Sequence, residues 1–452
     1  MSLVETLART HYETGADGLQ IAGVSIVSVA RQFGTPFYAY APDIFRKKMA
    51  SLRGTLPFAE LYYSMKANPN PSVVKTFVDA GAGIEIASGG ELSIALRCGC
   101  DPARILFAGP GKRESELKAA MNAGIGEFHV ESFMEIERID TLSRLAGARS
   151  PVSIRVNAGE AARNGAMVMS GESSPFGIDE ERLFEAIEKV AGSPHLAFTG
   201  LHFYAGTQIL DADAFAGTYS YCLDLAKDVC RGTGLRLATI DFGGGFGIPY
   251  FEHDCELDLD SLSDSLASVF RDARASHGLE HTRFIIEPGR YLVADGGLYA
   301  ARIIDIKTSR GTAFIILDGG MHHNIAPTGH FGQIIKRNFP IAIANRIQEA
   351  PVMEYHIVGP LCTPLDTMGR NVMLPRAEIG DVVVFFQAGA YALTASPVRF
   401  LSHPEPVELM VEDNHVRVAR FPVEAGIHES DPDTSVLANQ LNVSNVSPIP
   451  TA

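Results

Sequence analysis

Between residues 60 and 287, short apolar runs with strand character alternate with stretches whose apolar residues recur at helical spacing. Helix-like stretches such as 113–123, 133–146 and 215–230 separate the strand-like runs. Eight strand-like runs end near Lys66, Ala87, Ala108, Val130, Asn157, Tyr204, Phe242 and Glu287. Eight such units over about 240 residues predict an α/β fold, a closed parallel (β/α)8 TIM barrel. The alternative is an open doubly wound sheet, which usually has fewer strands and leaves its edges exposed.

After residue 290 the pattern changes to short β-rich runs separated by Gly, Pro and Asp, which predict a second, all-β domain. The runs cover residues 297–306, 313–317, 353–358, 381–387, 406–411 and 415–420. One helix-like stretch, 331–346, interrupts them and carries Lys336, Arg337 and Arg346. We therefore divide the chain into a barrel, residues 41–295, and a β-domain, residues 296–422. Residues 1–40 form an arm that contributes to the β-domain, and the polar tail 423–452 is expected to be mobile.

Composition narrows the class of protein. With 452 residues and 46% hydrophobic content, the chain can bury the cores of two domains. A formal charge of −15 argues against sequence-independent binding to nucleic acid or to anionic membranes. The six cysteines show neither a paired framework nor zinc-ligand spacing, and no leader-like or membrane-spanning apolar run is present. These features predict a soluble cytoplasmic protein with reduced thiols.

Lys66 is the first candidate for chemistry. The aromatic run before it favours a buried strand, and Asn68-Pro69-Asn70-Pro71 ends that strand directly after the lysine. We expect Lys66 at the carboxyl end of a strand, facing a cavity, where a desolvated amine can attack an aldehyde and form a Schiff base. The alternative is a surface lysine at the end of a strand.

Two further motifs follow the seventh and eighth predicted strands. The glycines of residues 241–247, DFGGGFG, allow backbone amides to approach a phosphate, although a tight turn alone would also use them. Glu287-Pro288-Gly289-Arg290 places a carboxylate beside a guanidinium, with a structural ion pair as the alternative. A lysine, a phosphate cradle, a carboxylate and a stacking aromatic ring in one barrel mouth predict a site for pyridoxal 5′-phosphate.

The chain resembles the pyridoxal-phosphate decarboxylases of fold type III, the group of ornithine/arginine and diaminopimelate decarboxylases. The resemblance covers about residues 20–405 and is carried by seven motifs in the same order as in the family. These are YSMKAN at 63–68, IEIASGGE at 84–91, GLHFYAGTQ at 200–208, DFGGGFGIP at 241–249, EPGR at 287–290, GPLCTPLD at 359–366 and QAGAYALTAS at 387–396. It implies a barrel plus a β-domain, a head-to-tail homodimer with shared active sites, and decarboxylation of an amino acid.

The resemblance also assigns roles to single residues. Lys66 matches the Schiff-base lysine, Glu287 the acid that pairs with the ring nitrogen, and Cys362 the thiol that returns a proton in the neighbouring subunit's site. Residues that match phosphate ligands are Thr207, Gly244, Gly245, Arg290 and Tyr391. Those that match the surroundings of the cofactor ring are Glu85, His202 and Tyr204. For Glu85 a purely structural hydrogen bond is the alternative, and for His202 we favour the interpretation of a core histidine with satisfied nitrogens.

Three departures from the family pattern bear on the substrate. Tyr204 stands where the ornithine and diaminopimelate enzymes stack a histidine on the cofactor. Thr363 replaces the acid that binds a distal amine, and residues 322–333 replace an Arg-Pro-Ala-Leu-Tyr-like segment that binds a distal carboxylate. Thr363, Asp366 and His330 remain candidate substrate-binding residues, with a structural role as the alternative for Asp366.

These departures make diaminopimelate and ornithine poor candidate substrates. The chain resembles instead decarboxylases of specialised pathways, including those associated with exosortase systems and those that act on glutamyl carrier proteins. This resemblance implies a modified or carrier-tethered amino acid, and the basic stretch 331–346 could meet an acidic carrier. The alternative for that stretch is an ordinary solvated helix face.

Other functions are weaker candidates. The histidines at 322, 323 and 330 lack the spacing of a metal-ligand pair, so we expect no metal. A racemase or epimerase using the same lysine-bound cofactor is the alternative enzyme. A non-catalytic pyridoxal-phosphate-binding protein is the alternative from another class, but such proteins usually lack a second β-domain and the Cys362 loop.

Overall fold

The computed structural model describes residues 2–159, 173–204, 206–330 and 336–422. Contacts divide the chain into two compact units. The barrel unit contains Phe45–Pro249 and His253–Val293. The β-rich unit contains Met1–Ile44, Tyr250–Glu252 and the chain from Ala294 onward. Within the described ranges, no helix has both the length and the apolar character that a membrane span requires.

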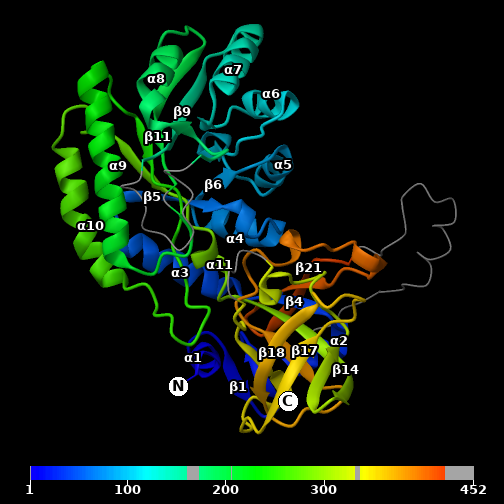
Figure 1. The fold of residues 1–452 in the computed structure, drawn as a ribbon. Coiled ribbons are helices and arrows are strands. Elements are labelled where there is room, and N and C mark those ends of the chain that lie inside the picture. The colour runs from blue at the N-terminus through cyan, green and yellow to red at the C-terminus, as the bar shows by residue number, and fades with distance from the viewer. Residues whose placement is uncertain (1, 160–172, 205, 331–335, 423–452) are drawn as a thin grey trace, which may run out of the picture. The chain divides into compact units, whose positions relative to one another are not determined.

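The barrel unit contains eight parallel strands in a closed ring (Figure 1). They are β5 (Ala59–Ser64), β6 (Gly83–Ile86), β7 (Ile105–Phe107), β8 (Glu127–Val130), β9 (Ser150–Asn157), β11 (Leu196–His202), β12 (Thr239–Asp241) and β13 (Arg283–Ile286). Neighbours in the chain are neighbours in the ring, and the pairing of β13 with β5 completes it. Two-residue β10 (Ile178–Asp179) pairs with β9 outside the ring. All eight predicted strands are present, and the closed ring confirms the barrel over the open sheet.

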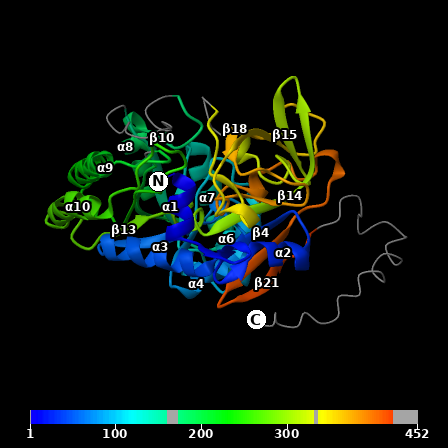
Figure 2. The same ribbon diagram turned by 90° about the horizontal axis from the view of Figure 1, so that it is seen from below.

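Helix α3 precedes the first barrel strand and the other helices follow barrel strands, and several of them begin and end at the expected signals. They are α3 (Pro42–Thr55), α4 (Pro71–Asp79), α5 (Gly89–Arg97), α6 (Glu114–Ala123), α7 (Phe133–Ala146), α8 (Leu183–Ala191), α9 (Ala212–Thr233), α10 (Leu259–Arg274) and the single turn α11 (Arg290–Val293). For example, the Ser132 side chain caps the start of α7, and Gly147 ends it in the left-handed conformation. Figures 1 and 2 both show α9 and α10 side by side.

The barrel interior is polar as well as apolar. Successive side chains of β8 point to opposite faces of the strand. Glu127 and His129 therefore share one face, and Phe128 and Val130 share the other. The Thr239 hydroxyl on β12 donates a hydrogen bond of 2.8 Å to Glu127 on β8. Because two strands separate β8 from β12 in the ring, this bond must cross the interior. Polar groups on distant strands can therefore meet inside the barrel.

The β-rich unit combines the start of the chain with its last third (Figure 2). Its large sheet contains β4 (Phe37–Tyr40), β14 (Gly297–Ser309), β15 (Thr312–Leu317), β16 (Ile341–Ile343), β17 (Met353–Val358), β18 (Thr367–Leu374), β19 (Val382–Phe385), β20 (Val407–Glu412) and β21 (His415–Arg420). A small sheet contains β1 (Glu13–Gly15), β2 (Gly18–Ile21) and β3 (Val24–Ser25), beside helices α1 (Leu3–Thr10) and α2 (Ile26–Phe33). Strand β4 pairs with both β14 and β20, so the N-terminal segment supplies a strand of the large sheet.

The helix predicted over residues 331–346 is wrong for the described part, 336–346. Residues 336–340 have no regular structure, Ile341–Ile343 form β16 against β19, and Ala344–Arg346 make one 3₁₀ turn. Apolar spacing misled the prediction, because Ile341 and Ile343 are buried strand residues and Pro340 precedes them. Lys336 donates to the Thr367 carbonyl oxygen and Arg346 pairs with Asp381, so this part does not form a solvated basic helix. Residues 331–335 and the predicted mobile tail, 423–452, lie outside the described residues.

Candidate active site

Lys66 lies directly after the first barrel strand. Strand β5 ends at Ser64, and Met65–Ala67 form a 3₁₀ turn that presents the lysine at the carboxyl end of the barrel. The Lys66 side chain is 41% exposed and its Nζ lies 3.1 Å from Oε2 of Glu85, whose side chain is 1% exposed. The Ser64 hydroxyl donates a second hydrogen bond, of 2.5 Å, to the same Glu85 oxygen. A buried carboxylate therefore holds an accessible amine at the carboxyl end of β5.

The glycine loop after β12 has a backbone that only glycine can follow. Gly243 and Gly245 adopt φ angles of +67° and +108°. A Cβ atom on Gly244 would lie 2.6 Å from the carbonyl oxygen of Glu287. The N–H groups of Gly244 and Gly245 make no hydrogen bond to any described residue. Two unused N–H groups in a partly exposed loop at the carboxyl end of strands are suited to an anion such as phosphate.

The loop that carries Thr207 is joined to the glycine loop. The Ile209 N–H donates to the Gly245 carbonyl oxygen at 2.9 Å, and the Gly247 N–H donates to the Ile209 carbonyl oxygen at 3.0 Å. Thr207 lies two residues before Ile209, so these bonds hold it close in space to Gly244 and Gly245. Arg290 is the first residue of α11, three residues after Glu287. The four predicted phosphate ligands of the barrel unit thus lie on neighbouring loops.

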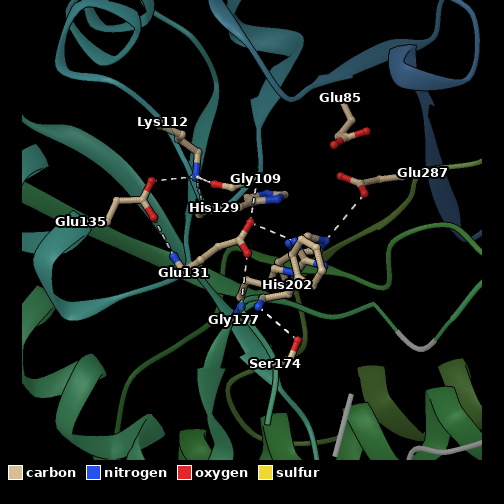
Figure 3. A network of polar contacts seen from close by, with 12 residues as sticks. Glu85, Gly109, Lys112, His129, Glu131, Glu135, Ser174, Gly177, His202 and Glu287 are labelled. Atoms are coloured by element: carbon tan, nitrogen blue, oxygen red, sulfur yellow. Dashed lines mark hydrogen bonds and ion pairs between the residues drawn. The ribbon is translucent and has the colours of Figure 1, made fainter. Parts of the chain in front are cut away.

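Glu287 and His202 form a buried pair that lacks normal hydrogen bonds. Each side chain is 2% exposed, and Nε2 of His202 lies 3.6 Å from Oε2 of Glu287 (Figure 3). Neither ring nitrogen of His202 makes a hydrogen bond to any described residue. Oε1 of Glu287 has no hydrogen-bond partner among these residues either. Burial, then the neighbouring His129 ring and Arg155, lowers the pKa of His202 well below its usual value. His202 is therefore not the satisfied core histidine that we favoured from the sequence.

Two residues that the sequence analysis did not assign, His129 and Asp241, complete this group. The His129 and His202 rings lie 4.2 Å apart between centroids. Nε2 of His129 lies 3.9 Å from Oδ2 of Asp241, and both side chains are fully buried. We call His129, His202, Asp241 and Glu287 the inner cluster. One pattern in the sequence could have pointed to such residues, namely polar residues at alternating positions in apolar strand runs. Glu127 and His129 in EFHV are an example.

Tyr204 lies beside the glycine loop. A Cβ atom on Gly243 would approach its ring to 3.1 Å, and the Arg155 guanidinium carbon lies 5.8 Å from its ring centroid. Tyr204 is half-buried, so one part of the ring stays accessible. An aromatic face is thus available beside the glycine loop.

A second set of buried charges, which we call the paired network, lies next to the inner cluster (Figure 3). It contains Lys112, Glu131, Glu135 and Arg155, none of which the sequence analysis assigned. Lys112 Nζ donates to Glu135 and to the carbonyl oxygens of Gly109 and His129, all within 2.8 Å. Glu131 accepts from Arg155 at 2.9 Å and from the Gly109 N–H at 2.6 Å. Burial raises the pKa of Glu131, but Arg155 and Lys112 lower it by more, so the group is held ionised.

The remaining predicted site residues belong to the β-rich unit. Cys362 is exposed, Thr363 is half-buried, Tyr391 has a φ angle of +51°, and His330 is exposed. Asp366 is buried, and its two oxygens accept hydrogen bonds from the N–H groups of Met321 at 2.7 Å and Leu361 at 2.9 Å. It therefore fixes the Cys362 loop to the segment after β15, which matches the structural alternative for this residue.

Thr363 and Asp366 also line a cavity of about 510 Å³ in the β-rich unit. Besides Asp366, its charged or titratable lining residues are Lys307, His356 and Arg370. The structure thus brings together Lys66 with Glu85, Glu287 with His202, and the loops of Thr207 and the glycines. In the other unit it brings together Thr363 and Asp366.

Comparison with known proteins identifies relatives over nearly the whole chain. Residues 43–294 match the family described as pyridoxal-dependent decarboxylase, pyridoxal binding domain. The chain is 36% identical over 399 residues to the L-glutamyl-[BtrI acyl-carrier protein] decarboxylase of Niallia circulans, covering 87% of this chain and 93% of that protein. It is 32% identical over 411 residues to the diaminopimelate decarboxylase of Methanothermobacter thermautotrophicus, covering 89% and 92%.

Solved structures agree with this result. Diaminopimelate decarboxylase from Helicobacter pylori complexed with L-lysine superposes with a TM-score of 0.79 at 28% identity, covering 87% of this chain and 96% of that chain. AQ1208 from Aquifex aeolicus gives a TM-score of 0.84 at 28% identity, covering 97% and 100%.

The residues present fit pyridoxal phosphate. That cofactor needs an amine for its aldehyde, donors for its phosphate and a partner for its ring nitrogen. Lys66 offers an accessible amine, and Gly244 and Gly245 offer unused N–H groups in a cradle that a Cβ atom would fill. Glu287 offers a buried carboxylate oxygen that has no hydrogen-bond partner among the described residues. An unsatisfied buried oxygen is costly unless a ligand completes it.

Proposed function

The chain belongs to the pyridoxal-dependent decarboxylases, and on that premise we propose that it decarboxylates an amino acid whose side chain is modified or tethered to a carrier. It is an enzyme, a carboxy-lyase with pyridoxal phosphate as cofactor. A glutamyl group on an acyl-carrier protein is the substrate class that we favour, because a relative carries that activity in its name. The observation that carries the proposal is the missing charge at the distal end of the substrate site.

The described residues directly after Met321, 322–330, include no Lys or Arg that could bind a distal carboxylate. His322 and His323 are 0% and 1% exposed, and their rings lie 3.7 Å apart. Burial lowers the pKa of His322 to about 3 and that of His323 to about 4, so both rings are neutral at pH 7. Free diaminopimelate would need a charged clamp where the chain has these neutral, inward-facing rings. A side chain whose carboxyl group is blocked as a thioester needs none.

The position after Cys362 supports the same substrate class. Thr363 has no charge, so it cannot pair with the distal ammonium of ornithine or diaminopimelate. A glutamyl thioester has no distal ammonium. The distal carboxylate and ammonium of diaminopimelate, and the distal ammonium of ornithine, thus lose the partners that the resemblance assigns to them.

The residues of the barrel unit would hold the cofactor as follows. Lys66 binds the aldehyde, Glu287 the ring nitrogen and Tyr204 one ring face. Phosphate ligands are Thr207, Gly244, Gly245 and Arg290, with Tyr391 added by its match to the family motif alone. Bound pyridoxal phosphate supplies an electron sink for the pair left on the α-carbon when carbon dioxide departs. An ionised Glu287 keeps the ring nitrogen protonated, which favours loss of carbon dioxide over the weaker sink of a racemase.

Cys362 returns a proton to the α-carbon, and the protein acts as a homodimer in which this thiol serves the neighbouring subunit. Its exposure on the Cys362 loop supports this role, because a thiol that reaches another subunit must be accessible. All six cysteines are unpaired, which supports a cytoplasmic location. Mixing inactive Lys66→Ala and Cys362→Ala subunits should restore about a quarter of the activity, since half of the dimers then hold one complete site. No recovery would contradict shared sites.

The substrate is tested by measuring carbon dioxide release. The panel is L-glutamate, meso-diaminopimelate, L-ornithine, an N-acetylcysteamine thioester of glutamate and glutamyl acyl-carrier protein, with Lys66→Ala as the control. We expect release from the carrier-bound glutamate and slower release from the small thioester. Rapid turnover of free diaminopimelate would overturn the substrate proposal, and inversion of the α-carbon without carbon dioxide would establish the racemase.

A further inference from the structure

The inner cluster contains more negative charge than its surroundings can compensate. Asp241 and Glu287 come from β12 and from the end of β13, and both are at most 3% exposed. One ligand atom from each of the four cluster residues lies within 4.8 Å of the others. Two ionised carboxylates at this distance in a dry interior would repel strongly. At least one positive charge or one proton is needed.

The neighbouring cations are already used. Arg155 pairs with Glu131 at 2.9 Å, and Lys112 pairs with Glu135 at 2.7 Å. Lys66 follows β5, the neighbour of β13 in the ring, and pairs with Glu85. These charged groups near the cluster come from β6, β9, α7 and the segments after β5, β7 and β8, and Glu127 on β8 joins them.

Glu127 has its own partners. Its Oε2 accepts from Thr239, and its Oε1 lies 3.3 Å from Nε2 of His129. His129 is thus shared between Glu127 and Asp241, whose Oδ2 lies farther away, at 3.9 Å. His202 cannot supply the charge, because burial keeps it neutral. A proton held within the Asp241–Glu287 pair compensates the charge without using any group that is already paired.

We propose that Asp241 carries a proton in the folded protein and acts as a positioning residue, so that Glu287 is the only negative charge that the inner cluster presents to the cofactor. Oδ1 of Asp241 accepts from the Gly243 N–H at 2.8 Å, which leaves Oδ2 as the oxygen that holds the proton. Oδ2 has no hydrogen-bond partner among the described residues, so a proton there is free to be donated toward Glu287. Burial, and next the Glu287 carboxylate, raise the pKa of Asp241 well above its usual value.

The consequence concerns the ring nitrogen. A proton on Asp241 removes the second carboxylate that would otherwise compete for the proton of the ring nitrogen. It also lets the Asp241 O–H fix the orientation of Glu287, while the glycine loop that follows Asp241 holds the phosphate. One residue thus links the two ends of the cofactor site. This inference rests on the proposed cofactor-facing role of Glu287, but not on the identity of the substrate.

Infrared spectroscopy of the cofactor-free and the cofactor-loaded protein tests the proposal directly. A protonated buried carboxylic acid gives a C=O stretching band that ionised carboxylates lack. We expect such a band at pH 7.5, its loss in Asp241→Asn and its retention in Glu127→Gln, the matched control on β8. Retention of the band in Asp241→Asn, with loss in Glu127→Gln, would place the proton on Glu127 and overturn the proposal.

A second variant serves where Asp241→Asn does not fold. Glu287→Gln removes the neighbouring charge, so the Asp241 band should disappear at lower pH than in the wild-type protein. The raised-pKa aspartates of the β-rich unit, Asp318 and Asp366, should be unaffected by this change. An unchanged titration of every acid band would overturn the proposal. Stoichiometric retention of a divalent cation, detected by elemental analysis and lost in His129→Gln, would also overturn it, because a metal ion would then supply the charge.

None of these measurements depends on turnover. A failure of the substrate proposal would leave the infrared result unchanged. A failure of the infrared test would leave carbon dioxide release unchanged.

Discussion

The barrel unit holds two adjacent sets of buried polar groups that differ in how completely they are paired. In the paired network, every charged group has a charged partner or backbone donors within 3.2 Å. In the inner cluster, ring nitrogens of His129 and His202 and one oxygen each of Asp241 and Glu287 have no hydrogen-bond partner among the described residues. The two sets lie side by side in the barrel unit (Figure 3).

This difference in pairing indicates that the paired network stabilises the fold, whereas the inner cluster serves the cofactor site. Buried charges that are fully paired stabilise the fold, and losing one partner leaves the other exposed to the full desolvation penalty. Buried polar atoms without partners destabilise the cofactor-free protein and are expected where a ligand completes them. Variants of the paired network should therefore lose stability, and variants of the inner cluster and its neighbours should lose activity.

Lys66→Ala should have the largest effect, and only on activity. Removal of the amine that binds the cofactor aldehyde should lower kcat/KM by about 10⁴-fold or more. The unfolding free energy should change by no more than about 1 kcal/mol, because the side chain is 41% exposed and Glu85 keeps the Ser64 hydrogen bond. Carbon dioxide release and urea denaturation measure the two effects. Substantial activity in this variant would remove Lys66 from the mechanism.

Lys112→Met should break the paired network and mainly reduce stability. The substitution keeps most of the side-chain volume but leaves Glu135 without its cation, so we expect a loss of about 3–5 kcal/mol in the free energy of unfolding. Lys118→Met is the matched control, because its pair with Glu114 is exposed and should contribute little to stability. Equal losses in the two variants would contradict the distinction between buried and exposed pairs.

Glu287→Gln should mainly reduce activity and leave stability nearly unchanged, the opposite of Lys112→Met. Loss of the charge that faces the ring nitrogen should lower kcat by about 10²–10³-fold. Stability should stay within about 1 kcal/mol of the wild type or increase, because the variant removes a buried, incompletely paired charge. Parallel kinetics and denaturation would show both effects. A loss of stability as large as that of Lys112→Met would make Glu287 a structural residue and remove the contrast between the two sets.

The sequence predicted what depends on local pattern and on resemblance. Each barrel strand was visible because strand runs and helices have different periods, and Lys66 was visible because Asn68 and Pro69 end its strand. The predicted helix over 331–346 failed because a short apolar run such as Ile341–Ile343 fits a buried strand as well as a helix. Packing against β19, which is distant in sequence, decided between them.

The inner cluster could not be predicted for a related reason. Its members come from β8, β11, β12 and the end of β13, and they meet only because the ring closes and turns alternate residues inward. No local spacing links His129 to Asp241. A histidine in an apolar run is consistent with a satisfied core position, and only the three-dimensional contacts show that His202 lacks partners.

The smallest predicted effect extends the comparison to the β-rich unit, where His322 is also buried without hydrogen-bond partners among the described residues. Its pKa is lowered to about 3 by burial and by the His323 and His403 rings, whereas in the unfolded chain it is about 6.5. The unfolded chain therefore binds a proton that the folded protein rejects, and stability present above pH 6.5 is lost as the pH falls toward 3. Between pH 7 and pH 5 this ring should cost about 2 kcal/mol of unfolding free energy. His322→Phe should remove that part of the acid sensitivity, whereas His253→Phe, the exposed control, should not. An unchanged pH dependence of stability in His322→Phe would mean that the buried ring accepts the proton. Lack of hydrogen-bond partners alone would then not keep a histidine neutral in this fold.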